Sequence, residues 1–429
     1  MTKKPNFYLL ILLVTMLLIP LNIKAATKEN FQTVKLKNGL TVMYKVMKKE
    51  PMVSMYTVLP IGMNREKEKG IAHLLEHLVF RGGSGYTFSD IADVTNRQGG
   101  YFNGFTSFFA TSYNYVVPKE NFKAAFKVFN GSIWKTDLSE PVVTLERKIV
   151  LHELDMDYSS RYQYYPIYRY FFPELSYSKQ TVEAISASDL KEFHETYYQP
   201  DNATYIIAGD FDPQPVLQQL ESISNGYGRM NSPQSALSEF SMPHQDVIET
   251  RNLYPFQFQV LMTYEFSKMS VKERLVLKLL DFIYGSNSKI DYEKNEYKLY
   301  NTITRTVGTK DYFGLYYLER NKPFNDQAVN DEKANMKKFF REFKKIDFKN
   351  ELKRFVQFIE LEKIQSQESP ENAVEYEVQR LTNPDNISAD SIEILKKLTN
   401  KDLVQLLDKY FNQPPTAWVL VKTSKTGGI

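Results

Sequence analysis

The sequence contains no cysteine among its 429 residues. This absence excludes disulfides, thiolate metal sites and cysteine nucleophiles, so any metal ion must be held by His, Asp or Glu. Histidine is scarce too, with five residues. Hydrophobic residues make up 42% of the chain and aromatic residues 14%, a composition that builds real cores and excludes a disordered protein. At roughly 150 residues per domain, this length predicts two or three domains.

The N-terminus has the composition of an export signal. Lys3 and Lys4 precede an apolar stretch at 7–21, which is interrupted by Pro20 and followed by the small residues Ala25 and Ala26. This order is typical of a secretory signal peptide, and the stretch is shorter than the ~20 residues that a membrane-spanning helix needs. We therefore predict a signal peptide at 1–25, cleavage near Ala25, and a periplasmic or secreted bacterial protein without a stable membrane anchor. A retained membrane anchor is the alternative.

Cleavage would change the charge of the protein. It removes Lys3, Lys4 and Lys24 but no acidic residue, so the formal net charge falls from +3 to zero as the chain shortens from 429 to 404 residues. A neutral mature chain gives no electrostatic reason to expect nucleic acid as a partner.

An internal repeat predicts two related halves. The stretch 188–200, followed by an apolar run at 203–208, resembles the stretch 401–414 and the run that follows it at 417–421. Both read as a helix, a proline-containing turn and a buried strand. The two copies lie 213 to 214 positions apart, about half the mature length. We expect domains at 26–224 and 245–429, joined by a polar, Gly- and Pro-containing linker at 225–244.

Patterning predicts the elements of the first half. We expect a hairpin at 33–46 around the turn Asn38-Gly39, a strand at 53–61 and a strand pair at 101–117. Helices are expected at 72–80, from about Ser89 with that residue as its cap, at 119–134 and at 139–158.

Two of the five histidines stand four positions apart with a glutamate between them, as His73-Leu-Leu-Glu76-His77. Chance would give about 0.06 histidine pairs at this spacing, and average glutamate usage makes the full pattern rarer still. On a helix, these three side chains share one face. Two His at i and i+4 can bind Zn²⁺, and a neighbouring Glu that is not a ligand can act as base toward the water that zinc activates.

A catalytic zinc site needs a third protein ligand and an open position for water. Glu146 and Glu153 are seven residues apart on one expected helix and so lie on the same side. From spacing alone, either could complete the site. His152 points about 100° away from Glu153 and is expected to be structural.

At this point the sequence resembles the pitrilysin/insulinase family of inverted (HxxEH) zinc metallopeptidases. The resemblance is carried by the segments 38–40, 70–82, 99–107, 146–153 and 208–213. By this resemblance, His73, His77 and Glu153 are the ligands of one Zn²⁺ per chain, Glu76 is the general base, and Glu146 orients the site. The family fold is of the α+β class, with two related α/β units, each a mainly antiparallel sheet covered by helices.

The resemblance also implies how substrate binds. Family peptidases hold a peptide as an added strand at the sheet edge that matches 100–106, which includes Asn103, Gly104 and Thr106. For Asn103, the alternative is a turn-forming Asn before Gly104. In the second half, family enzymes carry an Arg seven residues before a Tyr. Tyr300 can stand for that tyrosine, but Tyr292 or Glu293 stands where the Arg is expected.

The resemblance therefore implies an exported zinc metalloendopeptidase of peptides or unfolded polypeptides. Because active chambers of the family contain four such units and this chain supplies two, we expect a homologous second chain that completes the chamber. A homodimer that uses Tyr300 or Arg305 is the second possibility. The alternative function is a non-catalytic scaffold or assembly subunit of the same fold.

Overall fold

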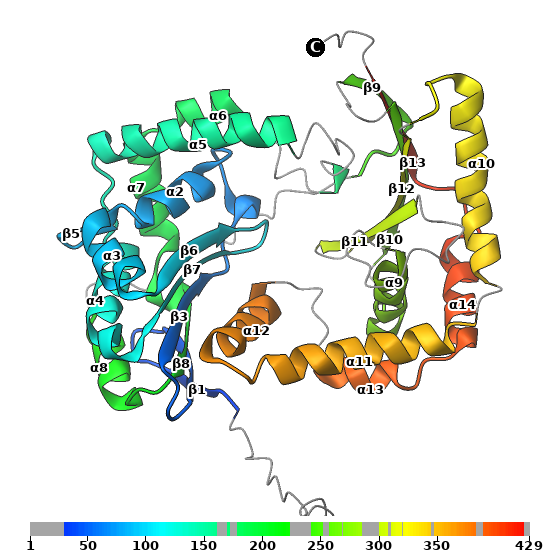
Figure 1. The fold of residues 1–429 in the computed structure, drawn as a ribbon. Coiled ribbons are helices and arrows are strands. Elements are labelled where there is room, and N and C mark those ends of the chain that lie inside the picture. The colour runs from blue at the N-terminus through cyan, green and yellow to red at the C-terminus, as the bar shows by residue number, and fades with distance from the viewer. Residues whose placement is uncertain are drawn as a thin grey trace, which may run out of the picture.

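The computed structural model describes residues 30–160, 170–171, 178–223, 242–251, 257–267, 269–284, 300–307, 310–319, 321–344, 347–382 and 389–423. The predicted signal peptide at 1–25 lies outside these residues, as does most of the predicted linker. The described residues form two α/β units, seen on the left and right of Figure 1. No helix within them is long and apolar enough to cross a membrane.

The first unit is built on a six-stranded sheet of β1 (Gln32–Lys35), β2 (Thr41–Val46), β3 (Met52–Leu59), β6 (Tyr101–Thr106), β7 (Thr111–Pro118) and β8 (Thr204–Gly209). Its helices are α2 (Ile71–Val79), α3 (Phe88–Val94), α4 (Phe122–Trp134), α5 (Glu140–Ser160), α6 (Lys179–Ala184), α7 (Ala187–Tyr197) and α8 (Pro213–Ile223). A short hairpin of β4 (Gly82–Gly83) and β5 (Tyr86–Thr87) connects α2 to α3.

The second unit is built on a five-stranded sheet of β9 (Val247–Arg251), β10 (Phe258–Ser267), β11 (Tyr300–Val307), β12 (Lys310–Glu319) and β13 (Ala417–Thr423). Its helices are α9 (Val271–Tyr284), α10 (Asp326–Phe343), α11 (Lys349–Gln365), α12 (Pro370–Thr382), α13 (Ala389–Leu395) and α14 (Asn400–Tyr410).

The two sheets have the same topology. The strand order β6-β7-β3-β8-β2 of the first corresponds position by position to β11-β12-β10-β13-β9 of the second. In each sheet one pair is parallel, β2 with β8 and β9 with β13, while the other pairs are antiparallel. The prediction of two related, mainly antiparallel α/β units is therefore confirmed.

The sequence repeat corresponds to α7–β8 in the first unit and α14–β13 in the second. Both helices begin with a capping box, in which Ser186 pairs with Asp189 and Thr399 pairs with Asp402. In the box, the side chain of the first residue accepts from the backbone N–H three positions on, and the Asp carboxylate accepts in return. The repeated Ser/Thr-x-x-Asp pattern thus fixes the start of the same helix twice.

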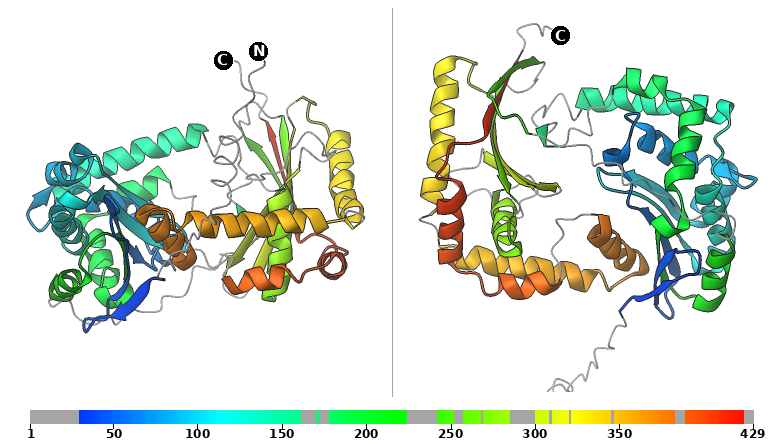
Figure 2. Two further views of the ribbon diagram at one scale, coloured as in Figure 1. Left: turned by 60° about the horizontal axis from the view of Figure 1, so that its bottom comes forward. Right: turned by 180° about the vertical axis from the view of Figure 1, so that it is seen from behind.

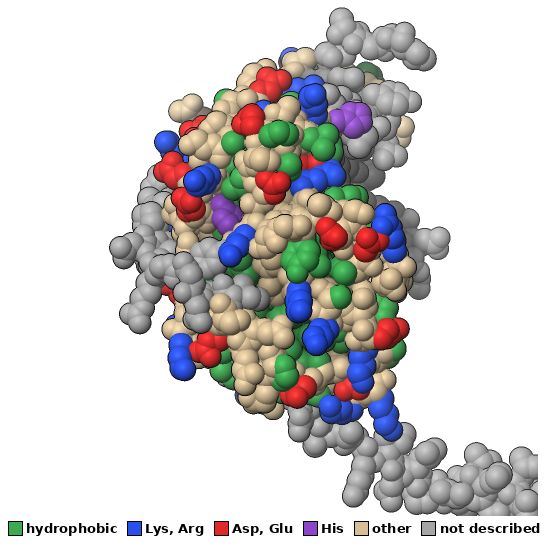
Figure 3. Space-filling model, turned by 90° about the vertical axis from the view of Figure 1, so that its left-hand side faces the viewer, with side chains coloured by type: hydrophobic (Ala, Val, Ile, Leu, Met, Phe, Trp, Pro, Cys, Tyr) green, Lys and Arg blue, Asp and Glu red, His purple; other side chains and the backbone are tan. Residues whose placement is uncertain are grey.

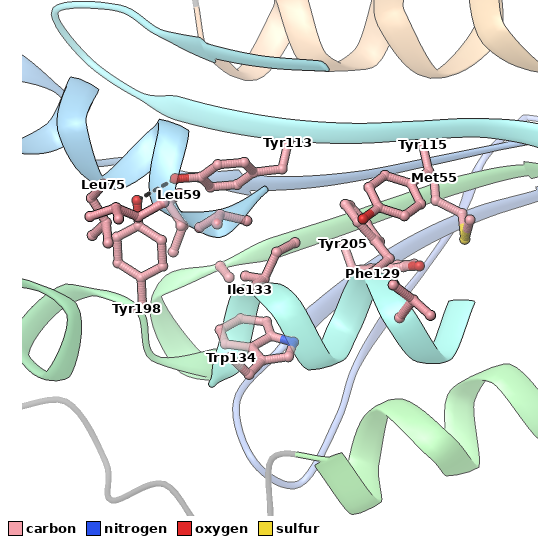
Figure 4. Packing of buried hydrophobic residues seen from close by; sticks show 14 of the residues in the cluster. Met55, Leu59, Leu75, Tyr113, Tyr115, Phe129, Ile133, Trp134, Tyr198 and Tyr205 are labelled. Carbon is pink, nitrogen blue, oxygen red and sulfur yellow. Dashed lines mark hydrogen bonds between the residues drawn. The ribbon is translucent and has the colours of Figure 1, made fainter. Parts of the chain in front are cut away.

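The first core lies between its sheet and the helices on one face (Figure 1). Figure 4 shows its aromatic centre, where Tyr113 of β7 and Tyr198 join their hydroxyls at 2.6 Å next to Leu75 of α2. These residues are essentially inaccessible to solvent, so α2 rests on a rigid layer.

Helix α12 belongs to the second half of the sequence but packs on the other face of the first sheet, as both views of Figure 2 show. Ala373, Val374 and Val378 pack there against apolar residues that include Met43 and Ile206. The preceding helix α11 crosses between the units, and residues 361–365 at its C-terminal end are exposed on all sides.

The second sheet also contacts the first unit. Its helices α9, α10 and α14 cover one face, and its other face packs against Met63, Phe108 and Phe171. On the outer face of the first unit, seen in Figure 3, basic and acidic side chains are interspersed.

Most expected elements of the first half are present, with small differences in their ends. One expectation is wrong: α3 begins at Phe88, and its cap is Thr87, which forms a capping box with Asp90, not Ser89. The pattern Thr-x-x-Asp satisfies two backbone donors reciprocally, which a cap at Ser89 would not do.

Candidate metal centre

Helix α2 places the H-x-x-E-H residues on one side. Its six apolar residues are buried in the core, whereas His73, Glu76 and His77 are only partly buried. The buried apolar side fixes how α2 is rotated on the sheet, and as a consequence the three polar side chains all point away from the core to the same side of the helix.

The start of α2 is held by a glutamate that sequence reasoning missed. The carboxylate of Glu66 accepts hydrogen bonds from the backbone N–H groups of Gly70, at 3.1 Å, and Ala72, at 3.0 Å. Gly70 has a φ of 95°, a conformation that favours glycine. Burial raises the pKa of Glu66 to about 7. An acidic residue just before a helix was the available sequence signal, because it complements the helix dipole.

Helix α5 packs beside α2 (Figure 1). It carries Glu153, which reaches the two histidines. Glu153 Oε2 lies 3.4 Å from His77 Nε2 and 3.8 Å from His73 Nε2. Within the described residues, these three residues are the group of His and acidic side chains that could hold a metal ion, and their ligand atoms lie within 4.8 Å of one another.

The geometry suits zinc. Four-coordinate zinc holds N and O ligands at ~2.1 Å, which separates neighbouring ligand atoms by about 3.4 Å. The distances from Glu153 to the two imidazoles are close to this value. Two imidazole nitrogens and one carboxylate oxygen also form the donor set of catalytic zinc sites, which leave a fourth position open.

Glu76 lies against the edge strand β6. Its Oε2 accepts a hydrogen bond from the Thr106 hydroxyl at 2.6 Å. A Cβ atom on Gly104 would lie 2.7 Å from Glu76 Cγ, so the glycine is what lets the strand approach this side chain. Burial raises the pKa of Glu76, which poises this carboxylate to accept a proton.

The two histidines differ in their surroundings. Burial and the neighbouring His77 lower the pKa of His73 to about 4, which favours the neutral imidazole that binds metals. Burial lowers the pKa of His77 too, but its hydrogen bond with Glu146 and the nearby carboxylates outweigh burial and raise it.

Glu146 lies on the far side of His77, with its Oε2 3.4 Å from His77 Nδ1. Its other oxygen, Oε1, forms an ion pair with Arg81 Nε. Glu146 therefore contacts the histidine nitrogen that faces away from Glu153. The spacing of Glu146 and Glu153 alone could not tell which of the two faces the metal-binding nitrogens of the histidines. Arg81 was not predicted from the sequence, because no residue pattern indicates its contact with Glu146.

The remaining candidate residues are placed as follows. Asn103 lies within β6, paired with Asn114, so the alternative of a turn-forming Asn is wrong. Tyr300 begins β11 and pairs with Tyr317, while Tyr292 and Glu293 lie outside the described residues. Arg305 is buried over the ring of Phe108, with its guanidinium 4.5 Å from the ring centre, so it does not face open space.

The histidines outside the motif do not join the group. His152 is exposed on α5. His194 is buried, stacks on Tyr198 and has its Nε2 2.9 Å from the carbonyl oxygen of Ile133, which makes it structural.

The fold and this site define a two-unit α/β protein with a His-His-Glu group that could hold a metal ion, a donor set of the kind found in metallopeptidases. A model of "Insulinase (Peptidase family M16)" matches residues 42–165, and a model of the "Peptidase M16 inactive domain" matches residues 184–308. The chain belongs to this family, M16, which includes pitrilysin and insulinase.

Curated relatives are named as zinc proteases. An uncharacterized zinc protease of Rickettsia bellii is 24% identical over 428 residues, which covers 93% of this chain and 100% of the relative. Zinc protease PqqE of Helicobacter pylori is 28% identical over 45% of this chain and 47% of its own length. Probable zinc protease PqqL of Escherichia coli is 25% identical over 50% of this chain, but the match spans only 26% of PqqL.

Solved structures share the fold. A protease from Helicobacter pylori has a TM-score of 0.72 at 21% identity, covering 92% of this chain and 99% of that one. Pitrilysin has a TM-score of 0.66 at 17% identity, covering 93% of this chain and 45% of that one. The first half of the periplasmic protease PqqL from Escherichia coli has a TM-score of 0.66 and is covered to 92%. This chain thus corresponds to one half of the longer proteins.

Proposed function

We propose that this chain is an exported zinc metalloendopeptidase that hydrolyses peptide bonds in peptides or unfolded polypeptides. The observation that carries the proposal is the convergence of His73, His77 and Glu153 beside a partly buried Glu76 at a sheet edge. The zinc-protease names of the relatives support it.

The residues present would hold one zinc ion per chain, through His73 Nε2, His77 Nε2 and Glu153 Oε2. The metal supplies a Lewis acid that polarises the scissile carbonyl and lowers the pKa of water. Glu76 accepts the proton of the attacking water and passes it to the leaving amine. The Thr106 hydroxyl holds the carboxylate of Glu76 in place through this transfer.

Substrate would bind as an added strand along β6. This strand lies at the end of the sheet order, so one of its edges is unpaired within the described sheet. Gly104 lies on that strand beside Glu76, and Asn103 is its neighbour in the strand. Main-chain hydrogen bonds along this edge can hold an extended peptide. The scissile bond would then pass next to the metal.

Export and assembly are part of the proposal. The signal-like segment at 1–25 and the periplasmic location of the structurally similar PqqL support export. The longer relatives, twice this size, support a chamber completed by a homologous second chain. Tyr300 would contribute to substrate binding from the second unit.

The variant Glu76→Gln tests the proposal. We expect it to bind zinc as the wild type does and to lose at least ~10²-fold in peptide hydrolysis, because the amide cannot take up a proton. The measurements are zinc content by atomic absorption and cleavage of an internally quenched peptide by the mature chain, alone and with proteins that co-purify with it.

Full activity of E76Q would contradict the mechanism. A wild-type protein that holds zinc but shows no hydrolysis in any assembly would favour the alternative function, a non-catalytic scaffold. The match of residues 184–308 to an inactive domain is consistent with that alternative.

A further inference from the structure

Arg81 stands where the chain leaves the metal-binding helix. Its backbone N–H donates to the carbonyl of Leu78 at 2.9 Å and closes the last turn of α2. The next residue, Gly82, has a φ of 119° and turns the chain into the β4–β5 hairpin. The position of Arg81 is therefore fixed at both ends by backbone structure.

The side chain of Arg81 is held between two groups. Its Nε pairs with Glu146 Oε1, and its guanidinium lies 4.9 Å from the ring centre of Phe88. Phe88 is 44% exposed although it is a large apolar residue, and stacking on Arg81 accounts for this placement. The hairpin brings the chain back, so that Phe88 lies next to Arg81. The hairpin itself is packed tightly against the residues after α4, since a Cβ on Gly83 would lie 2.0 Å from the carbonyl oxygen of Lys135.

Glu146 divides its two oxygens between Arg81 and the metal centre. Oε1 forms the ion pair with the guanidinium of Arg81, and Oε2 lies 3.4 Å from His77 Nδ1. The Glu146 side chain is only 2% exposed, whereas Arg81 is 25% exposed. A carboxylate buried to this degree is costly unless a cation compensates it, and Arg81 is that cation.

The orientation of His77 depends on this carboxylate. When Glu146 accepts a hydrogen bond from Nδ1–H, Nε2 keeps its lone pair and points toward Glu153 Oε2. Partners of this kind fix both the tautomer and the ring orientation of a metal-binding histidine. A carboxylate that lost its cation could turn away, and His77 would lose the partner that holds its ring.

We propose that Arg81 is a positioning residue of the metal centre, which acts through Glu146 to hold His77 in its metal-binding orientation. This inference rests on the proposed zinc site. Arg81 is not one of the three residues that would hold the metal, so its effect would be exerted on the metal affinity through Glu146.

The test is a double-mutant cycle on zinc affinity, measured on the mature chain by competition with a chromogenic chelator. We expect Arg81→Met to weaken zinc binding by ten- to a hundredfold, the range for partners of metal-binding histidines. The zinc affinity of Arg81→Lys should lie between those of the wild type and Arg81→Met, because lysine keeps the charge but loses the planar stacking on Phe88. In the Glu146→Gln background, Arg81→Met should have no further effect, because a neutral amide needs no cation.

Arg97→Met serves as the matched control, because it breaks an exposed ion pair with Asp93 in the same unit and should leave zinc affinity unchanged. Thermal unfolding of each variant with a chelator present reports any loss of folding, and R81K carries the test if R81M does not fold. Wild-type affinity in R81M, or an equal further loss in the double variant, would overturn this inference alone. A wild-type protein that binds no zinc would overturn the proposed function as well.

Discussion

At the scale of single residues, the candidate site depends on the absence of a side chain as much as on those present. Gly104 sits where a Cβ atom would lie 2.7 Å from Glu76 Cγ and 2.8 Å from Phe80 Cε2. Both contacts are closer than carbon atoms tolerate, so a larger residue must displace Glu76 or the strand.

Gly104→Ala should therefore keep zinc and lose hydrolysis. We expect a loss of at least ~10-fold, because a shift of the base by about 1 Å misaligns it with the reacting water. Zinc content and the thermal midpoint report the state of the fold, and kcat/KM on a quenched peptide reports the base. An alanine variant with wild-type kcat/KM would show that Glu76 tolerates the displacement.

Glu66 gives a prediction for the pH dependence of stability. Its pKa is raised to about 7 by burial, from 4.5 in the unfolded chain. A raised carboxyl pKa contributes stability that is complete below about pH 4.5 and is lost as the pH rises through about 7. The loss is on the order of 3 kcal/mol for a shift of this size. Glu66→Gln removes this titration.

We therefore expect the free energy of unfolding of E66Q to rise relative to that of the wild type between pH 4.5 and 8. Urea unfolding across this range, with a chelator present, measures the difference. A difference that stays constant with pH would contradict the raised pKa.

At the scale of elements, sequence patterns predicted the structures that depend on neighbouring residues and missed the contacts between segments far apart in the sequence. The apolar spacing of α2 and the Asn-Gly turn at Asn38 depend on neighbours in sequence, and both were placed correctly. The spacing of Glu146 and Glu153 put them on one side of a helix but could not say which faces the histidines. That choice depends on how far α5 lies along α2, which is a matter of packing.

The position of α12 is the clearest case of a distant contact. Its apolar residues follow an ordinary helical spacing, so the sequence indicates a buried side but not which sheet buries it. Val374 is completely buried against the first sheet, more than 160 residues away from Ile206 in sequence. This docking ties a helix from the second half of the sequence to the sheet that carries β6.

Val374→Glu should destabilise the chain. An unpaired charge buried at this interface costs about 3–5 kcal/mol, and the urea midpoint should fall accordingly. Gln379→Glu adds the same charge at an exposed position of the same helix and should change stability by less than ~0.5 kcal/mol. Equal midpoints for the two variants would mean that α12 does not depend on this contact.

At the scale of the whole molecule, the two units share a topology but differ in the side chains they carry. Within the described residues, the group that could hold a metal ion lies entirely in the first unit. In the second unit, Arg305 is buried over Phe108 and so cannot serve substrate, which weakens the possibility of a homodimer that uses it. Under the proposed mechanism, a donor to the developing oxyanion would come from Tyr300 or from another chain.

The relatives favour another chain. Pitrilysin and PqqL each contain about twice the length that this chain covers, so a homologous second chain would bring this protein to the same number of units. A missing oxyanion donor typically costs ~10²–10³ in rate. We therefore expect the isolated, zinc-loaded chain to cleave peptides at least ~100-fold more slowly than its assembly with a homologous chain. Size-exclusion chromatography with light scattering, followed by kcat/KM on each species, measures this. An isolated, monodisperse chain as active as the assembly would show that the two units are sufficient by themselves.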